Sequence, residues 1–599
     1  MEHAPYGGSF MVADIGGDNV VTPEDFAEEH RRVRASAETF LRSELLPAFK
    51  RVEEPDIRLT RRLLRRMGEL GLLEVGLPLA GGAPGPGQVG AALLAETLGP
   101  CTSFALAALF HTDFGMLPIA CYGTEDQRHA WLPEMAAGRR IAAFALSEPE
   151  AGSDALGVRT NAAVAEDGTS CVLNGSKRYI ANAGIADVFL TFAKLEGRQF
   201  SAFALDRDTL ASGVGPEDEM MGLRGLSVCP IRLDGVEAPR DRLLGSAGKG
   251  HRIALNAVNV GRMKLGAAAL GVMKEALTLS VSHAKERKQF GKPISSFPLN
   301  ASKLATMNAL IYVTESMVYR TAGCLDRAFA RAFGEKPGAM DEALAEFAIE
   351  CSIVKVFASE ALGRVADETL QLHGGAGYAS GTPAERIYRD SRVFRIFEGT
   401  NEINRLRIPT TLLRRALKGG IPLLARAEEA QAELLKPLPL PPLAAEFLER
   451  ETGIAAALKK TFLLAGGLAL QRYGLRLERE QELVAILADL MIDAYALESA
   501  CVRTVKIGRE KGAEAAALGA RMTAWFADEA ARKAFGNARM LLAALERGES
   551  LRLQTALLRK LLHFEPIDAV AALRDTAAAV LRAGRYVCGN TEGAAETEN

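Results

Sequence analysis

The sequence predicts a mainly α-helical protein with a central β-domain. Aromatic residues are only 6% of the 599 residues, while Ala, Leu and Arg are abundant, and this composition favours packed helices over β-sandwiches. Apolar residues recur at helical spacing before residue 142 and after residue 250, whereas the stretch between has the pattern of short strands. The chain is too long for one domain and, at 48% hydrophobic, it can fill several cores.

The N-terminal region, residues 1–141, is predicted to be a helical domain. Thr22, followed by Pro and then Glu24, has the chemistry of a helix N-cap and a first-turn acid. Amphipathic spacing continues in Phe26–Leu46, and helical spacing resumes beyond a Gly/Pro-rich loop at Gly81–Gly90. That loop contains a G-x-G-x-x-G string. Because no βαβ pattern surrounds the string, we do not interpret it as a dinucleotide site.

Residues 142–250 are predicted to form a β-domain of short strands. Asn174–Gly175 has the composition of a hairpin turn between the strands on either side of it. The expected strands are Cys171–Leu173, Arg178–Ile180, Val188–Leu190, Phe200–Leu205 and Cys229–Leu233.

Helical spacing returns in residues 251–420, which are predicted to form a four-helix bundle. Residues 421–442 contain the string KPLPLPP and are expected to be a Pro-rich, semi-rigid linker. Residues 443–588 are again predicted to be a helical domain. The expected bundle helices are Ile253–Lys288, Leu299–Phe333, Met340–His373 and Ile403–Leu417.

Charge and cysteine spacing exclude several classes of function. The net charge of -2 leaves no basic footprint for nucleic acid. The eight cysteines include no C-x-x-C pair, so we expect no metal site, and free thiols in a reducing compartment. There is no recognisable signal peptide and no run of roughly 18 uninterrupted apolar residues. We therefore expect a soluble cytoplasmic protein.

Two motifs in the β-domain have the residue types of a ligand site. Phe144–Asp154 (FALSEPEAGSD) ends in small residues, and Gly152 and Ser153 would let the backbone approach a flat or phosphorylated ligand. Asn174–Gly184 (NGSKRYIANAG) presents Tyr179, which would stack on a ring. For each motif alone, an ordinary strand-to-loop junction or a surface hairpin is an equally simple interpretation.

A third motif, Glu286–Gly291 (ERKQFG), ends a predicted long helix. Arg287 carries guanidinium donors that match a phosphate group, and Phe290 would pack on a base. The alternative is a basic helix end that interacts favourably with the helix dipole.

The richest pattern combines Gln371–Gly377 (QLHGGAG) with Arg395–Ile403 (RIFEGTNEI). Glu398 stands between Phe397 and Gly399 among apolar segments, where a carboxylate is costly unless it is paired or functional. This residue is either a base that abstracts a proton or an acid near the start of the next helix. The residues alone leave both interpretations open.

Taken together and in this order, the motifs resemble those of the acyl-CoA dehydrogenase family over about Pro23–Leu417. Tyr312–Met317 (YVTESM) and Ala488–Ser499 (ADLMIDAYALES) further resemble the very-long-chain branch, which carries an extra C-terminal helical domain. The resemblance implies the family fold: an N-terminal helical domain, a β-barrel-like middle domain and a four-helix bundle. The extra domain corresponds to residues 443–588.

The resemblance implies FAD as the cofactor, bound between the β-domain and the bundle and reaching across the subunit contact of a homodimer. The residues expected to contact FAD are Phe144, Leu146, Ser147, Gly152, Ser153, Tyr179, Ala181, Arg287, Phe290, Gln371, Gly375, Thr400, Asn401 and Glu402. Those from Arg287 to Gly375 would come from the neighbouring subunit. The residues expected to face acyl-CoA are Ser153, Asn259, Arg262, Phe397 and Gly399.

The implied reaction is the α,β-dehydrogenation of a fatty acyl-CoA to the trans-2-enoyl-CoA, the first step of β-oxidation. Glu398 would remove the α-proton, and flavin N5 would take the β-hydride. Some branches of the family place the base on another helix. Here that position is Gly261, which leaves Glu398 as the candidate.

One departure from the family pattern concerns the electron acceptor. Ala181 stands where the family usually has a Ser or Thr hydroxyl bonded to flavin N5. An acyl-CoA oxidase that uses oxygen is therefore the nearest alternative to a dehydrogenase that reduces an electron-transfer flavoprotein. A non-catalytic assembly protein on the same fold is a second alternative.

The C-terminal domain of the related branch serves dimerisation and peripheral membrane contact. Leu443–Leu475 is accordingly either an amphipathic helix on the inner face of a membrane or a helix packed on the bundle.

Overall fold

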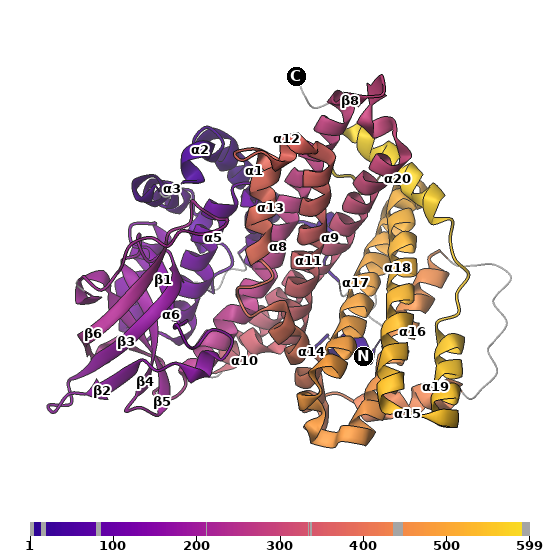
Figure 1. Cartoon of the computed structure of the whole chain (residues 1–599). Helices are drawn as coiled ribbons and strands as arrows, with labels where there is room; N and C mark the ends of the chain where they lie inside the picture. Colours follow the sequence, from indigo (N-terminus) through magenta and orange to yellow (C-terminus); the bar gives the residue numbers. More distant parts are fainter. Residues whose placement is uncertain are drawn as a thin grey trace.

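The computed structural model places the three parts of the chain side by side (Figure 1). The β-domain lies at one end, the long bundle helices stand in the middle, and the C-terminal helices pack on the other side of the bundle. This arrangement confirms the predicted fold class. The structure describes residues 5–13, 20–54, 56–78, 85–210, 212–333, 335, 338–434 and 447–589.

The N-terminal domain consists of helices joined by tight turns. Thr22 caps a single 3₁₀ turn, η3 (Pro23–Asp25), in which its backbone N–H donates to Asp25 at 2.8 Å. Two stretches wind as π-helix, which often occurs near functional sites: η4 (Leu41–Leu45) and η6 (Thr112–Met116). The α-helices are α1 (Glu28–Phe40), α2 (Phe49–Val52), α3 (Ile57–Glu69), α4 (Gly87–Leu98), α5 (Thr102–His111), α6 (Leu117–Tyr122) and α7 (Glu125–Ala136).

A seven-stranded sheet forms the β-domain, with strand order β6-β3-β2-β4-β5-β7 and with β1 paired to β4. The strands are β1 (Ala142–Ala145), β2 (Asn161–Val164), β3 (Ser170–Ala181), β4 (Val188–Leu195), β5 (Gln199–Asp206), β6 (Val228–Pro239) and β7 (Leu243–Leu244). β1 and β2 run parallel to β4, and the other pairs are antiparallel. The motif around Ser147 follows β1 directly, so the sheet fixes its starting point.

The hairpin predicted at Asn174–Gly175 is wrong. β3 continues through these residues, and its pairing with β6 shifts register between Leu173 and Gly175. A Cβ at Gly175 would lie 2.4 Å from Thr160 Oγ1, just before β2, a strand that the sequence analysis missed. The glycine therefore marks a bulge where two backbone segments approach closely, and not a turn.

The bundle helices begin and end within a few residues of their predicted limits. The exception is the third predicted helix, which divides at Phe347, where the backbone leaves helical geometry (φ -100°, ψ 31°). The bundle helices are α8 (Gly250–Glu286), α9 (Pro298–Ala332), α10 (Ala339–Glu346), α11 (Ala348–His373) and α14 (Asn401–Leu417). The connecting elements are β8 (Lys288–Gln289), β9 (Lys292–Pro293), α12 (Gly375–Tyr378) and α13 (Pro383–Val393).

The C-terminal domain is helical, as predicted, but part of the predicted linker is helical as well. Within residues 421–442, Leu423–Leu434 form helix α15, while Lys436–Pro442 lies outside the described residues. The other helices are α16 (Glu449–Tyr473), α17 (Gln481–Lys511), α18 (Ala513–Leu545), α19 (Gly548–Leu561) and α20 (Ala569–Ala583), with a 3₁₀ segment η11 (Gly474–Arg479).

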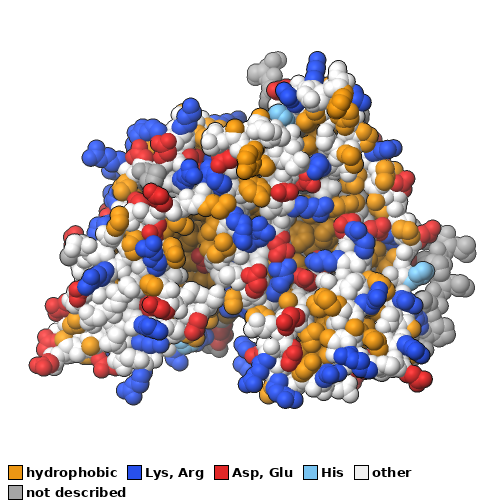
Figure 2. Space-filling view, in the orientation of Figure 1, with side chains coloured by type: hydrophobic (Ala, Val, Ile, Leu, Met, Phe, Trp, Pro, Cys, Tyr) orange, Lys and Arg blue, Asp and Glu red, His pale blue; other side chains and the backbone are white. Residues whose placement is uncertain are grey.

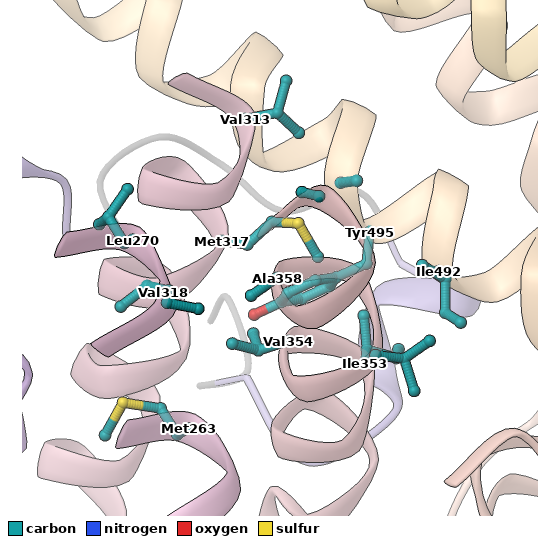
Figure 3. Close-up of a cluster of buried hydrophobic side chains, with 14 of the residues drawn as sticks. Met263, Leu270, Val313, Met317, Val318, Ile353, Val354, Ala358, Ile492 and Tyr495 are labelled. Carbon is teal, nitrogen blue, oxygen red and sulfur yellow. The ribbon is translucent and has the colours of Figure 1, made fainter. Parts of the chain in front are cut away.

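The C-terminal domain shares one core with the bundle. Figure 3 shows Val354 and Ala358 of α11 beside Tyr495 of α17, with Val318 of α9 and Met263 of α8 farther along the same buried cluster. A continuous apolar core makes the two parts one cooperative unit and not two domains joined only by a linker.

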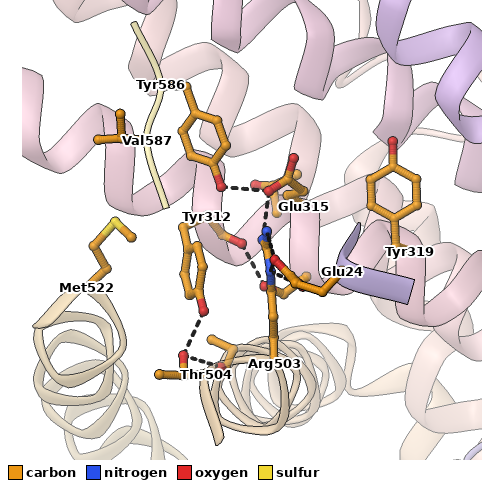
Figure 4. A network of polar contacts seen from close by, with 12 residues as sticks. Glu24, Tyr312, Glu315, Tyr319, Arg503, Thr504, Met522, Tyr586 and Val587 are labelled. Atoms are coloured by element: carbon orange, nitrogen blue, oxygen red, sulfur yellow. Dashed lines mark hydrogen bonds and ion pairs between the residues drawn. The ribbon is translucent and has the colours of Figure 1, made fainter. Parts of the chain in front are cut away.

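A buried cluster of charged and polar side chains joins distant segments of the chain at the same interface (Figure 4). Arg503 of α17 donates to Glu315 of α9 at 2.6 Å and to Glu24 near the N-terminus at 2.9 Å. Tyr586, beyond α20, donates its hydroxyl proton to the same Glu315 at 2.6 Å. The backbone N–H of Val587 donates to Asn308 of α9 at 3.1 Å, so the described end of the chain is packed and not frayed.

In the part of the chain that the structure describes, three helical stretches have the length and mean hydropathy to cross a membrane, although none is an uninterrupted apolar run. They are Thr102–Tyr122, Gly250–Glu286 and Glu449–Arg479, and 89%, 72% and 61% of their most apolar windows are buried. Their apolar faces are thus used largely in packing. All eight cysteines are free, and six of them are buried.

Candidate active site

Glu398 lies in a tight turn between α13 and α14. Its φ is +54° and that of the next residue, Gly399, is +78°, a backbone region that non-glycine residues seldom adopt. Helix α14 is capped by Thr400, whose hydroxyl accepts the Ile403 N–H at 3.2 Å. Glu402 supplies the acid of its first turn. The structure thus assigns the helix-start roles to other residues and leaves Glu398 without one.

Side chains from α8, α11 and α14 donate hydrogen bonds to the carbonyl groups of this turn. Arg262 Nε donates to the Glu398 carbonyl at 2.9 Å, and Lys355 Nζ and Asn404 Nδ2 each donate to the Gly399 carbonyl at 2.8 Å. Within the described residues, the Glu398 carboxylate makes no hydrogen bond or ion pair, and its backbone N–H has no acceptor. Both groups are therefore available to a ligand.

Burial raises the pKa of Glu398 to about 7. The positive charges of Arg262 and Lys355 oppose this shift, and the nearby carboxylate of Asp113 reinforces it. Arg262 is itself buried, and burial together with the charge of Arg407 lowers its pKa to about 9. A half-desolvated carboxyl group with a pKa near neutrality is suited to accept a proton from carbon.

A row of aromatic rings joins the β-domain to this turn. Ring centroids are 5.3 Å apart for Phe144 and Phe114, 5.3 Å for Phe114 and Phe110, and 6.4 Å for Phe110 and Phe397. The face shown in Figure 2 is hollowed between the β-domain and the bundle, with apolar side chains in the hollow. Such an apolar wall excludes water and explains the raised pKa of Glu398.

Phe114 also explains why no acid stands at Gly261. A Cβ at Gly261 would lie 2.4 Å from Phe114 Cζ, so any side chain there would displace the ring. The alternative position of a family base is thus filled by an aromatic side chain from the π-helical segment η6.

A second part of the site is the loop after β1. Lys177 Nζ, fully buried, donates to Glu148 at 2.8 Å and to the Leu146 carbonyl at 3.2 Å, which pins the loop to the sheet. The Ser147 carbonyl accepts the Arg178 N–H at 3.0 Å, and the next residue, Tyr179, is 62% exposed with a φ of +57°. The loop and the backbone next to an exposed aromatic ring therefore lie together.

Small, exposed residues follow in the same loop. No atom lies within 4 Å of a Cβ built at Gly152, and Ser153 is exposed. Ala181, at the end of β3, and Phe144 are half-buried next to the same hollow-facing core. Together they offer an aromatic face, hydroxyl groups and unhindered backbone, a set suited to a flat heteroaromatic ring with a polar chain.

The predicted phosphate-binding residues do not join this site within one chain. Gln371 lies about 24 Å farther along α11 than Lys355, at 1.5 Å per residue. Phe290, on the β8–β9 hairpin, is 92% exposed, and Figure 1 shows this hairpin and α12, which begins at Gly375, at the same end of the bundle. Arg287 caps the end of α8 at this same end.

Two predicted contact residues are turned into the protein. Asn401 is 3% exposed, and its side chain bonds Lys355, Ser359 and Glu360. Asn259 is 1% exposed and accepts from Arg262 at 3.3 Å. Neither side chain points freely toward a ligand, so each supports its neighbours.

Three groups near Glu398 were not predicted from the sequence: Lys355, Asp113 and the ring of Phe114. The sequence pattern around Lys355 could have indicated a functional residue, because it is a lone cation in the apolar run Ile353–Phe357 and burying an unpaired charge is costly. Asp113 and Phe114 gave no such signal, because only packing brings η6 against α8.

Four family models match consecutive parts of the chain. The acyl-CoA dehydrogenase N-terminal, middle and C-terminal domains match residues 27–139, 143–236 and 248–413, and a further acyl-CoA dehydrogenase C-terminal domain matches residues 457–560. The last match corresponds to the extra helical domain.

Relatives match either almost the whole chain or about half of it. A probable acyl-CoA dehydrogenase of Bacillus subtilis is 42% identical over 583 residues, covering 97% of this chain and 98% of the relative. The human mitochondrial very long-chain specific acyl-CoA dehydrogenase is 39% identical over 305 residues, which cover 49% of this chain and 44% of that protein.

A crystal structure of an acyl-CoA dehydrogenase from Bacillus anthracis, complexed with FAD, superposes with a TM-score of 0.94. Its sequence identity is 41%, and the match covers 98% of this chain and 100% of that one. The open space at Gly152 and the exposed ring of Tyr179 fit the flavin of this cofactor. The chain therefore belongs to the acyl-CoA dehydrogenase family and is an FAD-dependent enzyme.

Proposed function

We propose that the enzyme dehydrogenates fatty acyl-CoA thioesters between Cα and Cβ, with Glu398 as the base. The observation that carries this proposal is the carboxylate of Glu398: it has no partner among the described residues, its pKa is about 7, and it adjoins an aromatic wall. Ordinary structural carboxylates are paired or solvated.

The geometry of the turn supports a second task for the same residue. Arg262 and Lys355 hold the carbonyls on the C-terminal side of Glu398, while the N–H of Glu398 has no acceptor among the described residues. We propose that it donates to the thioester oxygen and stabilises the enolate-like charge that develops as the α-proton leaves. Bound FAD would supply the acceptor for the hydride from Cβ, and the substrate would lose two hydrogens and gain a C=C bond.

Proposed cofactor contacts follow the geometry of the loop after β1. Leu146, Ser147, Gly152, Ser153 and Tyr179 would hold the flavin, with Phe144 and Ala181 behind it. Thr400 and Glu402 lie at the start of α14, next to the base, and would close on the cofactor.

The direct test is an anaerobic titration of the FAD-loaded enzyme with saturated acyl-CoA thioesters of increasing chain length. The flavin absorbance should bleach, and mass spectrometry should detect a trans-2-enoyl-CoA two hydrogens lighter than the substrate. Failure of every chain length to bleach the flavin would contradict the proposal.

The rate should depend on pH through Glu398. Its raised pKa means that the active, ionised form is gained as pH rises through about 7. We expect kcat/KM to rise about tenfold per pH unit below that value and to level off above it. A profile that is flat across this range, at constant flavin content, would assign the proton transfer to another group.

We further propose a homodimer in which the exposed end of the bundle completes the partner's FAD site. Arg287, Phe290, Gln371 and Gly375 would supply the pyrophosphate and adenine contacts. An aromatic side chain that is 92% exposed, as Phe290 is, supports a covered surface.

Phe290→Asp should weaken this dimer by about 100-fold, because it removes a buried ring and adds a charge at the contact. Light scattering should then show monomer, with a lower flavin-to-protein ratio. Leu475→Asp, at a position that is 83% exposed on η11, is the matched control and should leave both values unchanged. A Phe290→Asp protein that stays dimeric and fully loaded would refute this arrangement.

Electron-transfer flavoprotein is the proposed electron acceptor, and oxygen is the second candidate. The observation that favours oxygen is Ala181, which brings no hydroxyl to the end of β3. Stopped-flow reoxidation of the reduced enzyme in air-saturated buffer separates the two: a rate as fast as turnover indicates an oxidase.

We also propose that the enzyme is cytoplasmic and touches the inner face of a membrane peripherally. Helix α16 is packed through Ile454, Leu458 and Phe462 and is not itself a free surface helix. The support comes instead from Leu417, Leu424 and Leu475, which are 68%, 68% and 83% exposed. Co-sedimentation with anionic and with zwitterionic vesicles tests this contact, and protein left in the supernatant with both would exclude it.

A further inference from the structure

Lys355 is a buried cation in the middle of the bundle. It lies on α11 and is 1% exposed, and its Nζ donates to the Gly399 carbonyl and to Asn401 Oδ1, both at 2.8 Å. No carboxylate of the described residues lies within 4.0 Å of it. Burying an ammonium group without a carboxylate partner is costly, so Lys355 lowers the free energy of unfolding.

Burial is the main reason why the position of Lys355 is unfavourable. The groups that face it are Arg262 from α8, Glu398 from the turn, Glu360 from its own helix and Glu402 from α14. Burial, followed by the repulsion of Arg262, lowers the pKa of Lys355 to about 7 despite the three acids. If packing were the only requirement at this position, a neutral side chain of similar length would give a more stable fold.

The contacts of Lys355 fall on the backbone that carries the base. Arg262 donates to the Glu398 carbonyl, and Lys355 donates to the Gly399 carbonyl. Two cations from different helices therefore restrain consecutive peptide groups. The positive φ of Glu398 needs such restraint, because an unrestrained residue would leave this conformation. Without these restraints φ of Glu398 would relax, and this would change the direction of its carboxylate relative to its N–H.

We infer that Lys355 is a positioning residue for the reaction: it holds the Gly399 carbonyl and thereby keeps Glu398 in the backbone conformation that aims its carboxylate at the substrate. This inference rests on the proposed function, in which Glu398 is the base.

The restraint extends to the C-terminal domain. Asn401, the second acceptor of Lys355, donates to Glu360 at 3.0 Å, and Arg405 holds Glu360 through two bonds of 2.6 and 2.9 Å. Arg405 also donates to Asp489 of α17 at 2.9 Å. A continuous polar chain thus runs from α17 to the turn, and the extra domain contributes to the rigidity of the site.

The experiment compares Lys355→Met with Lys506→Met in the full-length, FAD-loaded enzyme. Lys506 is a matched control, because it is 8% exposed and donates to Asp25 at 2.6 Å far from the turn. We expect Lys355→Met to lower kcat by about 100-fold, as a misplaced base does, with KM within about threefold of wild type. Lys506→Met should lower the melting temperature but keep kcat.

A second measurement, the pH profile of kcat/KM, distinguishes a positioning role from a purely structural one. Removing a cation that acts on Glu398 should move the acidic limb of the kcat/KM profile to higher pH, because Lys355 lowers the pKa of Glu398. Lys355→Gln, which keeps a donor one bond shorter, should recover part of the lost kcat and serves if the Met variant does not fold.

Several outcomes would overturn the inference. They are a kcat of Lys355→Met within about twofold of wild type, a loss matched by lost flavin, or an equal loss in Lys506→Met. A wild-type enzyme that does not dehydrogenate acyl-CoA would instead overturn the proposed function and, with it, this inference.

Discussion

Replacing Glu398 by Gln should lower kcat by about 10⁴-fold, the upper end of what a general base contributes. The amide has the size and shape of the carboxylate but cannot accept the α-proton. The turn itself should persist, because Arg262, Lys355 and Asn404 hold its backbone carbonyls and not the side chain. Flavin content and melting temperature should therefore match the wild type, and only turnover should fall.

The control for this variant is Glu53→Gln. Burial raises the pKa of Glu53 to about 7 as well, but this carboxyl accepts from Ser103 at 3.0 Å in the N-terminal domain. Its replacement should leave turnover within about twofold of wild type. If Glu398→Gln retains normal turnover with acyl-CoA, or if both variants lose activity equally, Glu398 is not the base.

Replacing Arg503 by Met should give the largest loss of stability, about 3–5 kcal/mol. The arginine is 1% exposed at its side chain and joins Glu24 and Glu315, which are 8% and 4% exposed. Its removal leaves Glu24 without an ion-pair partner among the described residues and leaves Glu315 with Lys274 as its cation (Figure 4). The N-terminal segment and α17 should then separate from the bundle at lower denaturant concentration.

Chemical denaturation followed by circular dichroism measures this effect, and Arg532→Met is the control. Arg532 pairs with Glu529 on the surface of α18, where its side chain is 70% exposed, so its loss should cost less than about 0.5 kcal/mol. Equal midpoints for Arg503→Met and Arg532→Met would show that the buried cluster does not fasten the domains.

The sequence determined most of the local structure. Helical spacing placed α8, α9 and α14 within a few residues of their observed ends, because the face of a helix that meets a core must be apolar every three or four residues. The turn predicted from residue type at Asn174–Gly175 was wrong, because a turn and a bulge both favour these residue types and only the partner strand distinguishes them.

The sequence also singled out Glu398, but it left its role open. A carboxylate before a helix is either a helix-end acid or a base, and residue type alone does not separate them. The structure assigns the cap of α14 to Thr400 and fills the space at Gly261 with Phe114, contacts that the chain order does not reveal and that support our proposal of Glu398 as the base.

What only the tertiary structure decided is how distant segments meet around that residue. Lys355 and Gly399 are far apart in the chain, yet one hydrogen bond joins them, and Asn401 turns inward because α11 offers it partners. Local sequence encodes backbone preference and the apolar face of each element. The distance between two functional groups depends instead on how whole helices pack, and packing is a property of the complete core.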